Sequence, residues 1–470
     1  MSNEYDRLTT GNSVYEKNRA RNIFLYHSYM GGSVYKKGEY LTKYSNESES
    51  EYEERVVNTP LDNHCKGVIS VYSSFLFRKP AHREWGSLEG DPSMAPFEND
   101  ADLEGRSLNA FMKEANTYAG IFGMSWIVVS KPNVNAGTRA EELSQNIRPY
   151  VSVITPLMML DWTYARSLSG HYNLTYVRYV EETNDSETVI KEWYPEVVIT
   201  TVIDAEKREV KNTVTEANGL GVVPVVAHYA QRSPYRGVGI SIINDIADIQ
   251  KAIFNEYSEI EQTIRLSNAA SLVKTPDTEA GAGPGAIILM PDNLDPSLKP
   301  YLLQPSGASV DSIYGSIDKR IAAIDRIAHL GAIRETSAKT MSGISRSMEF
   351  EQLNAKLAEI ADNLELSEEQ IMRYFALYQG TAWDGIVEYP NTFNIRDENA
   401  DLDFYLKAQA ANVPSATYRY EVAEAIAKLV IGDESDTMLA IHNELIAGEQ
   451  SIQSVAQSMV EDINGNDSTA

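Results

Sequence analysis

Apolar residues between positions 240 and 267 recur with the period of an α-helix. They follow one another at steps of three or four residues: Ile242, Ile246, Ile249, Ile253, Tyr257, Ile260 and Ile264. Side chains at this spacing share one helix face, whereas residues of a strand alternate between two faces. A helix over residues 240–267 would be about 42 Å long at ~1.5 Å per residue, which suits a strut or a bundle member. An ordinary amphipathic core helix remains an alternative.

A second face of the same helix carries acidic residues. Asp245, Asp248, Glu256 and Glu259 follow a similar spacing, and Ala252 fills the gap between them. A solvated stripe is the usual explanation for carboxylates in such a row.

Two further long helices are predicted, separated by short breaks. The first covers residues 309–330, with Ile313, Ile317, Ile321, Ile324 and Ala328 on one face. The second runs from residue 344 into the 370s, with Met348, Leu353, Leu357, Ile360, Leu364, Ile371 and Phe375 as its apolar positions. The insert at 268–308 is rich in Gly and Pro, and its AIILM and YLLQ segments predict two short strands. Residues 331–343 predict a flexible loop whose cations are Arg334 and Lys339.

The region from 105 to 235 predicts an α+β domain. A helix over 108–118 precedes the segment GIFGMSWIVVSKP, which has the β-branched and aromatic composition of a strand. Further strands are predicted over 150–154, 173–180, 188–194, 197–203, 209–214 and 222–228. Turn residues separate them, so antiparallel pairing is expected.

The two ends of the chain are less regular. Residues 1–50 predict an irregular, partly helical arm, residues 51–77 a helix that ends before Pro80, and residues 80–103 a linker or long loop. Near the C-terminus, helices are predicted over 415–430 and 435–446, followed by a frayed polar tail.

Charge narrows the possible partners. The 470 residues carry a net charge of −26, and the last 130 positions hold 7 basic and 23 acidic residues. Nucleic-acid affinity normally comes from Lys and Arg, so a surface that grips phosphates is not expected. A surface that repels DNA remains possible, and so does solubility through net charge.

Common catalytic and metal-binding motifs are not found in the sequence. It contains no GxxxxGK[ST] loop, no HExxH and no GxSxG, and its glycines at 281, 283 and 285 indicate a turn. The single cysteine, Cys65, excludes an intrachain disulfide and lies in a helical apolar pattern that predicts burial. No cofactor or metal is therefore expected, although a catalytic carboxylate pair stays open. The N-terminus lacks a signal-peptide pattern and no membrane-spanning run occurs, so a cytoplasm-like setting is expected.

Several segments in this order resemble the portal proteins of tailed bacteriophages. They are the helix end VYSSFLFRKP, the strand and bend YVSVITPLMMLDW, the helix start YRGVGISIINDIADIQKAIFNEYSE, and the loop-to-helix junction TSAKTMSGISRSMEFEQLNAKLAEIADNLE. Together they span most of residues 52–380. The resemblance implies an α+β, portal-like fold with a strand-rich wing domain, two long stem helices flanking a small clip, a long wing helix and a helical crown.

The resemblance also implies a division of the chain. It assigns residues 1–104 to an N-terminal arm, helix and linker, 105–235 to the wing, 236–267 and 309–330 to the two stem helices, 268–308 to the clip, 331–343 to the tunnel loop, 344–394 to the long wing helix and return strand, and 395–470 to the crown and tail.

A portal protein is a structural, non-enzymatic ring of about twelve subunits at one capsid vertex, through which DNA passes without tight binding. Its implied partners are the capsid protein, the terminase motor and a tail adaptor, in the virion and, during assembly, in the host cytoplasm, with no membrane. The isoleucines at 242, 246, 249, 253, 260 and 264 would pack between stems, the four carboxylates would line the channel, and Arg334 and Lys339 would touch DNA.

Two other functions remain open. Another head-to-tail adaptor or tail ring protein would also form a ring, but such proteins are usually shorter and lack the order of stem, clip, stem and tunnel loop. A cytosolic acid/base hydrolase would act as a monomer with turnover.

Overall fold

The computed structural model describes residues 2–133, 138–184, 186–268, 271–276, 279–280, 288–289, 295, 298–303, 308–331, 343–393, 398–411, 413–431 and 440–445. The chain divides into two compact units, Met1–Phe393 and Asn394–Ala470. They are called the first unit and the second unit.

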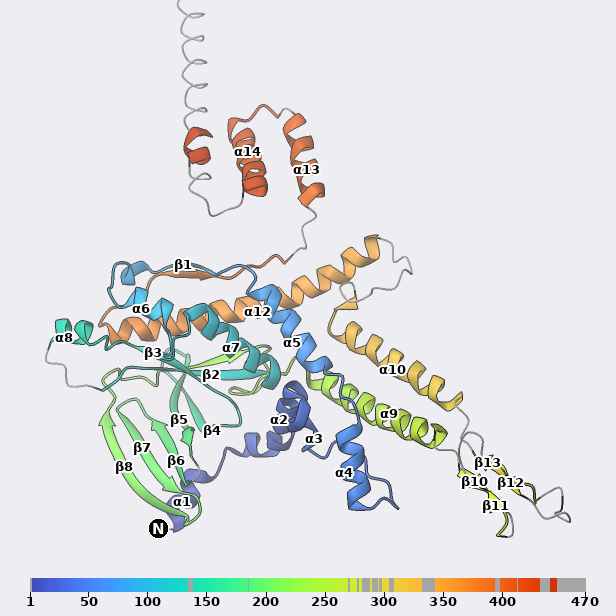
Figure 1. Ribbon diagram of the computed structural model, residues 1–470. Coiled ribbons are helices and arrows are strands. Elements are labelled where there is room, and N and C mark those ends of the chain that lie inside the picture. The colour runs from blue at the N-terminus through green and yellow to red at the C-terminus, as the bar shows by residue number, and fades with distance from the viewer. Residues whose placement is uncertain are drawn as a thin grey trace, which may run out of the picture. The chain divides into compact units, whose positions relative to one another are not determined.

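The N-terminal part of the first unit is helical. Its helices are α1 (Ser2–Thr9), α2 (Ser13–Met30), α3 (Gly32–Lys36), α4 (Glu49–Asn58) and α5 (His64–Leu76) (Figure 1). The single helix predicted over 51–77 is wrong, because α4 and α5 are separate. Pro60 lacks an N–H and disfavours helical geometry at the preceding residue, and Thr59 accordingly has ψ of 123°.

The linker or long loop predicted over 80–103 is also wrong. This segment contains the strand β1 (His82–Glu84), a 3₁₀ turn (Gly86–Leu88) and helix α6 (Met94–Asn99). Strand β1 pairs with β14 (Ile386–Glu388), which lies about 300 residues later in the chain. Leu88, Met94 and Phe97 are buried, so a few apolar side chains fix the segment despite its Gly, Pro and acidic composition.

Two antiparallel sheets form the strand-rich region. The three-stranded sheet has the order β3-β2-β9, with β2 (Met124–Ser130) between β3 (Tyr150–Ile154) and β9 (Val225–Tyr229). The five-stranded sheet runs in sequence order through β4 (Met159–Arg166), β5 (Tyr172–Thr183), β6 (Glu187–Trp193), β7 (Val197–Asp204) and β8 (Glu209–Ala217). Helices α7 (Leu108–Phe122) and α8 (Arg139–Ser144) belong to the same region. The predicted antiparallel strands are confirmed, and β4 is an additional strand.

The three predicted long helices are confirmed. They are α9 (Asn244–Asn268), α10 (Ala308–Ile327) and α12 (Gly343–Tyr378). Between α9 and α10, β10 (Ser271–Val273) pairs with β13 (Tyr301–Leu303), and β11 (Glu279–Ala280) pairs with β12 (Ile288–Leu289). Figure 1 shows α9 and α10 side by side, leading to these strands.

Helix α9 begins four residues later than predicted because the preceding chain bonds elsewhere. The N–H groups of Ile240 and Ile242 donate to the carbonyls of Gln231 and Gly120 instead of entering the helix. The backbones of Gly123 and Gly239 also approach closely: a Cβ added at Gly239 would lie 2.0 Å from the Gly123 carbonyl oxygen. These contacts anchor the start of α9 to the end of α7.

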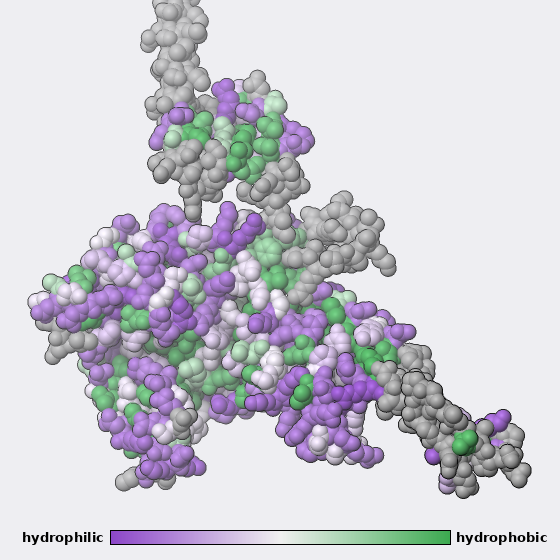
Figure 2. Space-filling model, viewed as in Figure 1, coloured by the Kyte–Doolittle hydropathy of each residue, from purple (hydrophilic) through white to green (hydrophobic). Residues whose placement is uncertain are grey.

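A continuous apolar core joins the helices of the first unit. It includes Phe24 of α2, Cys65 of α5, Phe111 of α7, Phe254 of α9 and Phe375 of α12. A second cluster, around Trp126, Trp162, Tyr179 and Trp193, lies between the two sheets. Figure 2 shows that hydrophilic side chains cover most of the visible face of the first unit. Among the described residues, no helix combines the length and the apolar character needed to cross a membrane.

The second unit contains α13 (Glu398–Ala410) and α14 (Ala416–Ile431). Helix α14 confirms the prediction over 415–430, whereas α13 was not predicted. Of the helix predicted over 435–446, residues 440–445 are described and are helical. Phe404 and Val430 are 66% and 68% exposed, and Figure 2 shows apolar side chains on these helices.

Candidate functional site

The isoleucine stripe of α9 packs inside its own chain. Ile246, Ile253 and Ile260 are at most 1% exposed and belong to one core with Ile317 and Ile324 of α10. Ile242 and Ile249 are partly buried against the same core, and Ile264 is 37% exposed. The stripe is thus a core-forming face in the single chain, and any contact of the stripe with another subunit stays a prediction.

Asp248, on the acidic face of α9, is bound by helix α2. The Arg21 guanidinium donates to both of its carboxylate oxygens, at 2.9 and 2.8 Å. Arg21 also donates to the Asn244 side-chain oxygen at 3.1 Å, so it spans one turn of α9. A bidentate arginine largely balances the charge of Asp248 and docks α2 onto the first turn of α9.

Glu256 connects the two long helices. Arg320 Nε lies 3.0 Å from both carboxylate oxygens, and the Ser316 hydroxyl donates to Oε1 at 2.7 Å. Both partners belong to α10, so Glu256 faces the neighbouring helix α10 rather than solvent.

The remaining two carboxylates keep their negative charge unbalanced. Glu259 accepts a hydrogen bond of 2.6 Å from the hydroxyl of Tyr44. Burial and this hydrogen bond raise the pKa of Tyr44 to about 12, so the phenol stays protonated and donates. Asp245 accepts a 2.9 Å hydrogen bond from the Asn244 amide and is exposed. Neither forms an ion pair with a cation of the described residues.

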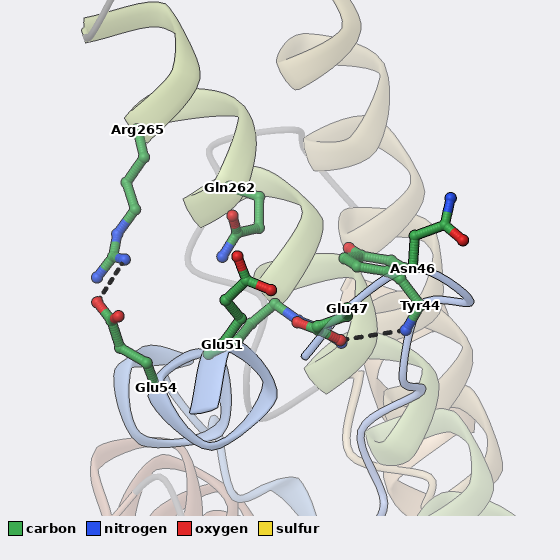
Figure 3. A pocket seen from close by; sticks show the side chains of 8 residues that line it. Tyr44, Asn46, Glu47, Glu51, Glu54, Gln262 and Arg265 are labelled. Atoms are coloured by element: carbon green, nitrogen blue, oxygen red, sulfur yellow. Dashed lines mark hydrogen bonds and ion pairs between the residues drawn. The ribbon is translucent and has the colours of Figure 1, made fainter. Parts of the chain in front are cut away.

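A pocket of about 350 Å³ lies beside the C-terminal part of α9 (Figure 3). It is lined by Tyr44, Asn46, Glu47, Glu51, Glu54, Arg55, Gln262 and Arg265. Two of these residues, Glu54 and Arg265, form an ion pair of 3.0 Å, as Figure 3 shows. Glu51 completes a capping box with Ser48 at the start of α4, which explains why the helix begins there.

Arg55 is a buried residue of the pocket wall. Its side chain is 2% exposed and pairs with Glu47 at 2.7 Å, while its other nitrogens donate to the Ser258 hydroxyl at 2.9 Å and the Thr42 carbonyl at 2.6 Å. The hydrogen bond from Arg55 lowers the pKa of Glu47. Each carboxylate lining the pocket therefore already has a partner. The contacts of Arg55 and Arg265 hold α4 and the 41–47 segment against α9.

The candidate chemistry outside this region is limited. Cys65 is buried, and burial raises the pKa of its thiol. Among the described residues, no cluster of three or more His, Cys, Asp and Glu side chains could hold a metal ion. Arg334 and Lys339 lie outside the described residues.

The partners of the acidic face were not foreseen from the sequence. Arg21, Tyr44 and Arg320 lie far from α9 along the chain or across a long insert, and no local spacing links them to their carboxylates. Their positions follow only from the tertiary packing of α2, the 41–47 segment and α10.

Neither a protein-family model nor a curated protein matches this sequence. Among solved structures, the chain is similar to one from the neck of an empty GTA particle computed with C6 symmetry. The two share 8% sequence identity with a TM-score of 0.45, over 81% of this chain and 95% of that chain.

Proposed function

We propose that this chain is the subunit of a cyclic portal ring at a capsid vertex, a structural conduit for genome packaging and ejection. The observation that carries the proposal is the order and packing of elements in the first unit. A strand-rich α+β region leads into α9, a small β insert, the paired helix α10 and the 36-residue helix α12. This is the order of wing, stem, clip, stem and wing helix that the sequence resemblance implies.

The helix pair has the mechanical properties that a stem needs. Helix α9 has 25 residues and α10 has 20, which correspond to about 38 and 30 Å at ~1.5 Å per residue. Buried isoleucines and the Glu256–Arg320 ion pair hold the two helices together, and Arg55 fixes α4 and the 41–47 segment against α9. A braced pair ending in short strands would present the 268–308 insert to the terminase motor and the tail adaptor, while other surfaces would meet the capsid protein.

Charge suits a channel that DNA must slide through. About twelve copies of a chain with net charge −26 carry on the order of −300 charges, and a wall of one sign repels phosphate. Because Arg21 and Arg320 balance Asp248 and Glu256, we assign the stronger channel-facing charge to Asp245 and Glu259.

The purified full chain is expected to form a ring with a central hole. Twelve copies of a 52.3 kDa chain correspond to a mass on the order of 600 kDa, and cyclic closure requires heterologous contacts. End-on electron micrographs and light scattering measure both properties. A monomer, or a two-fold dimer without a channel, would contradict the proposal. A three-dimensional map of the ring would also show whether Asp245 and Glu259 face the lumen.

Arg334 and Lys339 are proposed to touch the DNA backbone transiently as part of a tunnel loop. Replacing both residues by alanine is expected to lower the amount of DNA packaged or retained in particles several-fold, because two phosphate contacts per subunit are removed. The measurement is the DNA content of filled particles. Particles with unchanged packaging and retention would exclude this role and leave the ring itself untouched.

A further inference from the structure

A groove of about 900 Å³ in the first unit is lined by aromatic residues and arginines, although the chain as a whole is acidic. Strands β5 and β9, the loop after β9 and helix α12 form its walls. Its aromatic side chains are Tyr164, Tyr172, Tyr229, Tyr374 and Trp383, and its charged ones are Arg232, Arg236 and Arg373. No lysine, aspartate or glutamate is among the residues that line it. Arg373 pairs with Glu369 at 2.9 Å, so Arg232 and Arg236 give the groove its positive charge in a chain of net charge −26.

Two of these arginines lie on aromatic rings and form no ion pair. The Arg236 guanidinium lies 3.5 Å from the centroid of Tyr172, and that of Arg232 lies 5.3 Å from the centroid of Tyr229. No carboxylate among the described residues forms a salt bridge with either. Cation–π contact orders a guanidinium without neutralising it, so both groups stay available to an anionic partner.

Exposed apolar side chains accompany the arginines. Tyr172, Val222, Leu366 and Leu377 line the groove and are between 38% and 54% exposed. Tyr, Trp and Arg are enriched at the centres of protein–protein interfaces, and Lys, Glu and Asp are depleted there. The groove has this composition and is also concave. Apolar and aromatic side chains gathered in a concave site indicate an interaction surface rather than an ordinary solvated one.

We propose that this groove is one half of the contact between neighbouring copies of the chain, and that it receives an acidic segment of the adjacent subunit. The inference rests on the proposed ring and names the surface that closes it. In a cyclic ring each contact joins two different patches of the same chain. A basic, aromatic groove on a chain with 67 acidic and 41 basic residues finds its complement on the acidic surface of another copy.

Nucleic acid fits the groove less well. An approaching phosphate backbone would meet the field of the whole chain, which is strongly negative. A second copy of the chain is also negative, but the other contacts of the ring bring its carboxylates to the groove. These contacts offset the long-range repulsion between the two copies.

The test reverses the two unpaired charges in the full-length chain. The double variant Arg232→Glu/Arg236→Glu is expected to raise the concentration needed for half-maximal ring assembly by at least about 30-fold, since it places carboxylates against carboxylates. Light scattering and electron microscopy measure the assembly, and circular dichroism checks folding. The double variant Arg232→Gln/Arg236→Gln, which removes charge without reversing it, is expected to give a smaller shift in the same direction.

Lys66→Glu/Lys113→Glu is the matched control. These lysines are exposed on α5 and α7, outside the groove, and the variant changes the net charge by the same amount. It is expected to assemble like the wild type. If the wild type forms rings and the folded groove variant assembles equally well, the inference is wrong and the ring proposal stands. If the groove variant and the control lose assembly equally, net charge rather than the groove is responsible, which also overturns the inference. A wild type that forms no ring refutes the ring proposal instead.

Discussion

Replacing Arg83 by methionine is expected to lower the free energy of unfolding of the first unit by about 3–5 kcal/mol, because it leaves a buried carboxylate without its cation. Arg83 of β1 donates through Nε and Nη2 to the two oxygens of Glu368 on α12, the second at 3.1 Å. The side chains of Arg83 and Glu368 are 8% and 0% exposed. Tyr389 donates a further hydrogen bond of 2.6 Å to Glu368, which cannot balance a full charge alone.

The measurement is urea unfolding of wild type and variant, and the next carboxylate on the same helix supplies the control. Arg373→Met removes the partner of Glu369, but this pair is 51% and 25% exposed and should be worth less than about 1 kcal/mol. The double variant Arg83→Met/Glu368→Gln should recover part of the loss, because the buried charge is gone. Equal stability of Arg83→Met and wild type would mean that the Arg83–Glu368 ion pair does not stabilise the fold.

The same ion pair explains why the N-terminal linker was mispredicted. Residues 80–103 have little apolar periodicity, so no local pattern indicates order. Their order comes from non-local contacts: β1 pairs with β14, Arg83 binds α12 and Phe97 packs on Phe375 at a centroid distance of 4.7 Å. Such pairings depend on chain segments almost 300 residues apart, which single-sequence patterns do not encode.

The long helices were predictable because the residues that recur with helical period in the sequence are the ones buried in the folded chain. Ile246, Ile253 and Ile260 are buried at the spacing that the sequence displayed, and so are Leu353, Leu357, Ile360 and Leu364 of α12. Helix ends were less predictable. The backbone contacts between Gly123 and Gly239, not the side-chain pattern, decide where α9 begins.

For the candidate site, spacing predicted a shared face but not its neighbours. The four carboxylates of α9 do follow one helix face, yet Arg21 and Arg320 engage two of them from other elements. The basic groove was not predicted at all. Its arginines come from the loop after β9 and from α12, and the sequence between these segments contains the whole α9–α10 region.

Lowering the pH from 7 to 4 is expected to cost the first unit about 3 kcal/mol of stability through His228 alone. This residue of β9 is 0% exposed. Its Nδ1 lies 2.9 Å from the Ser367 hydroxyl, which itself donates to the Asn363 carbonyl at 2.7 Å, and its Nε2 lies 3.4 Å from the Asn116 side-chain oxygen. Burial lowers the pKa of His228 from 6.5 to about 4.

The direction follows from proton uptake. Between pH 6.5 and about 4 the unfolded chain binds a proton at this histidine that the folded chain does not bind, so the free energy of unfolding falls as the pH falls. Below about pH 4 the folded state is protonated as well, and the loss levels off.

The variant His228→Gln isolates this contribution, because glutamine keeps polar groups beside Ser367 and does not titrate. His27, whose pKa burial also lowers, and the ion-paired carboxylates are unchanged in the variant, so they cancel in the comparison. Urea unfolding at several pH values measures the free energy of unfolding of both proteins. From pH 7 to pH 4 the wild type should lose about 3 kcal/mol more of this free energy than the variant. A difference that stays constant over this range would show that His228 takes up its proton equally in both states. The buried contact between β9 and α12, which also form walls of the basic groove, would then have to open to water more easily than its packing indicates.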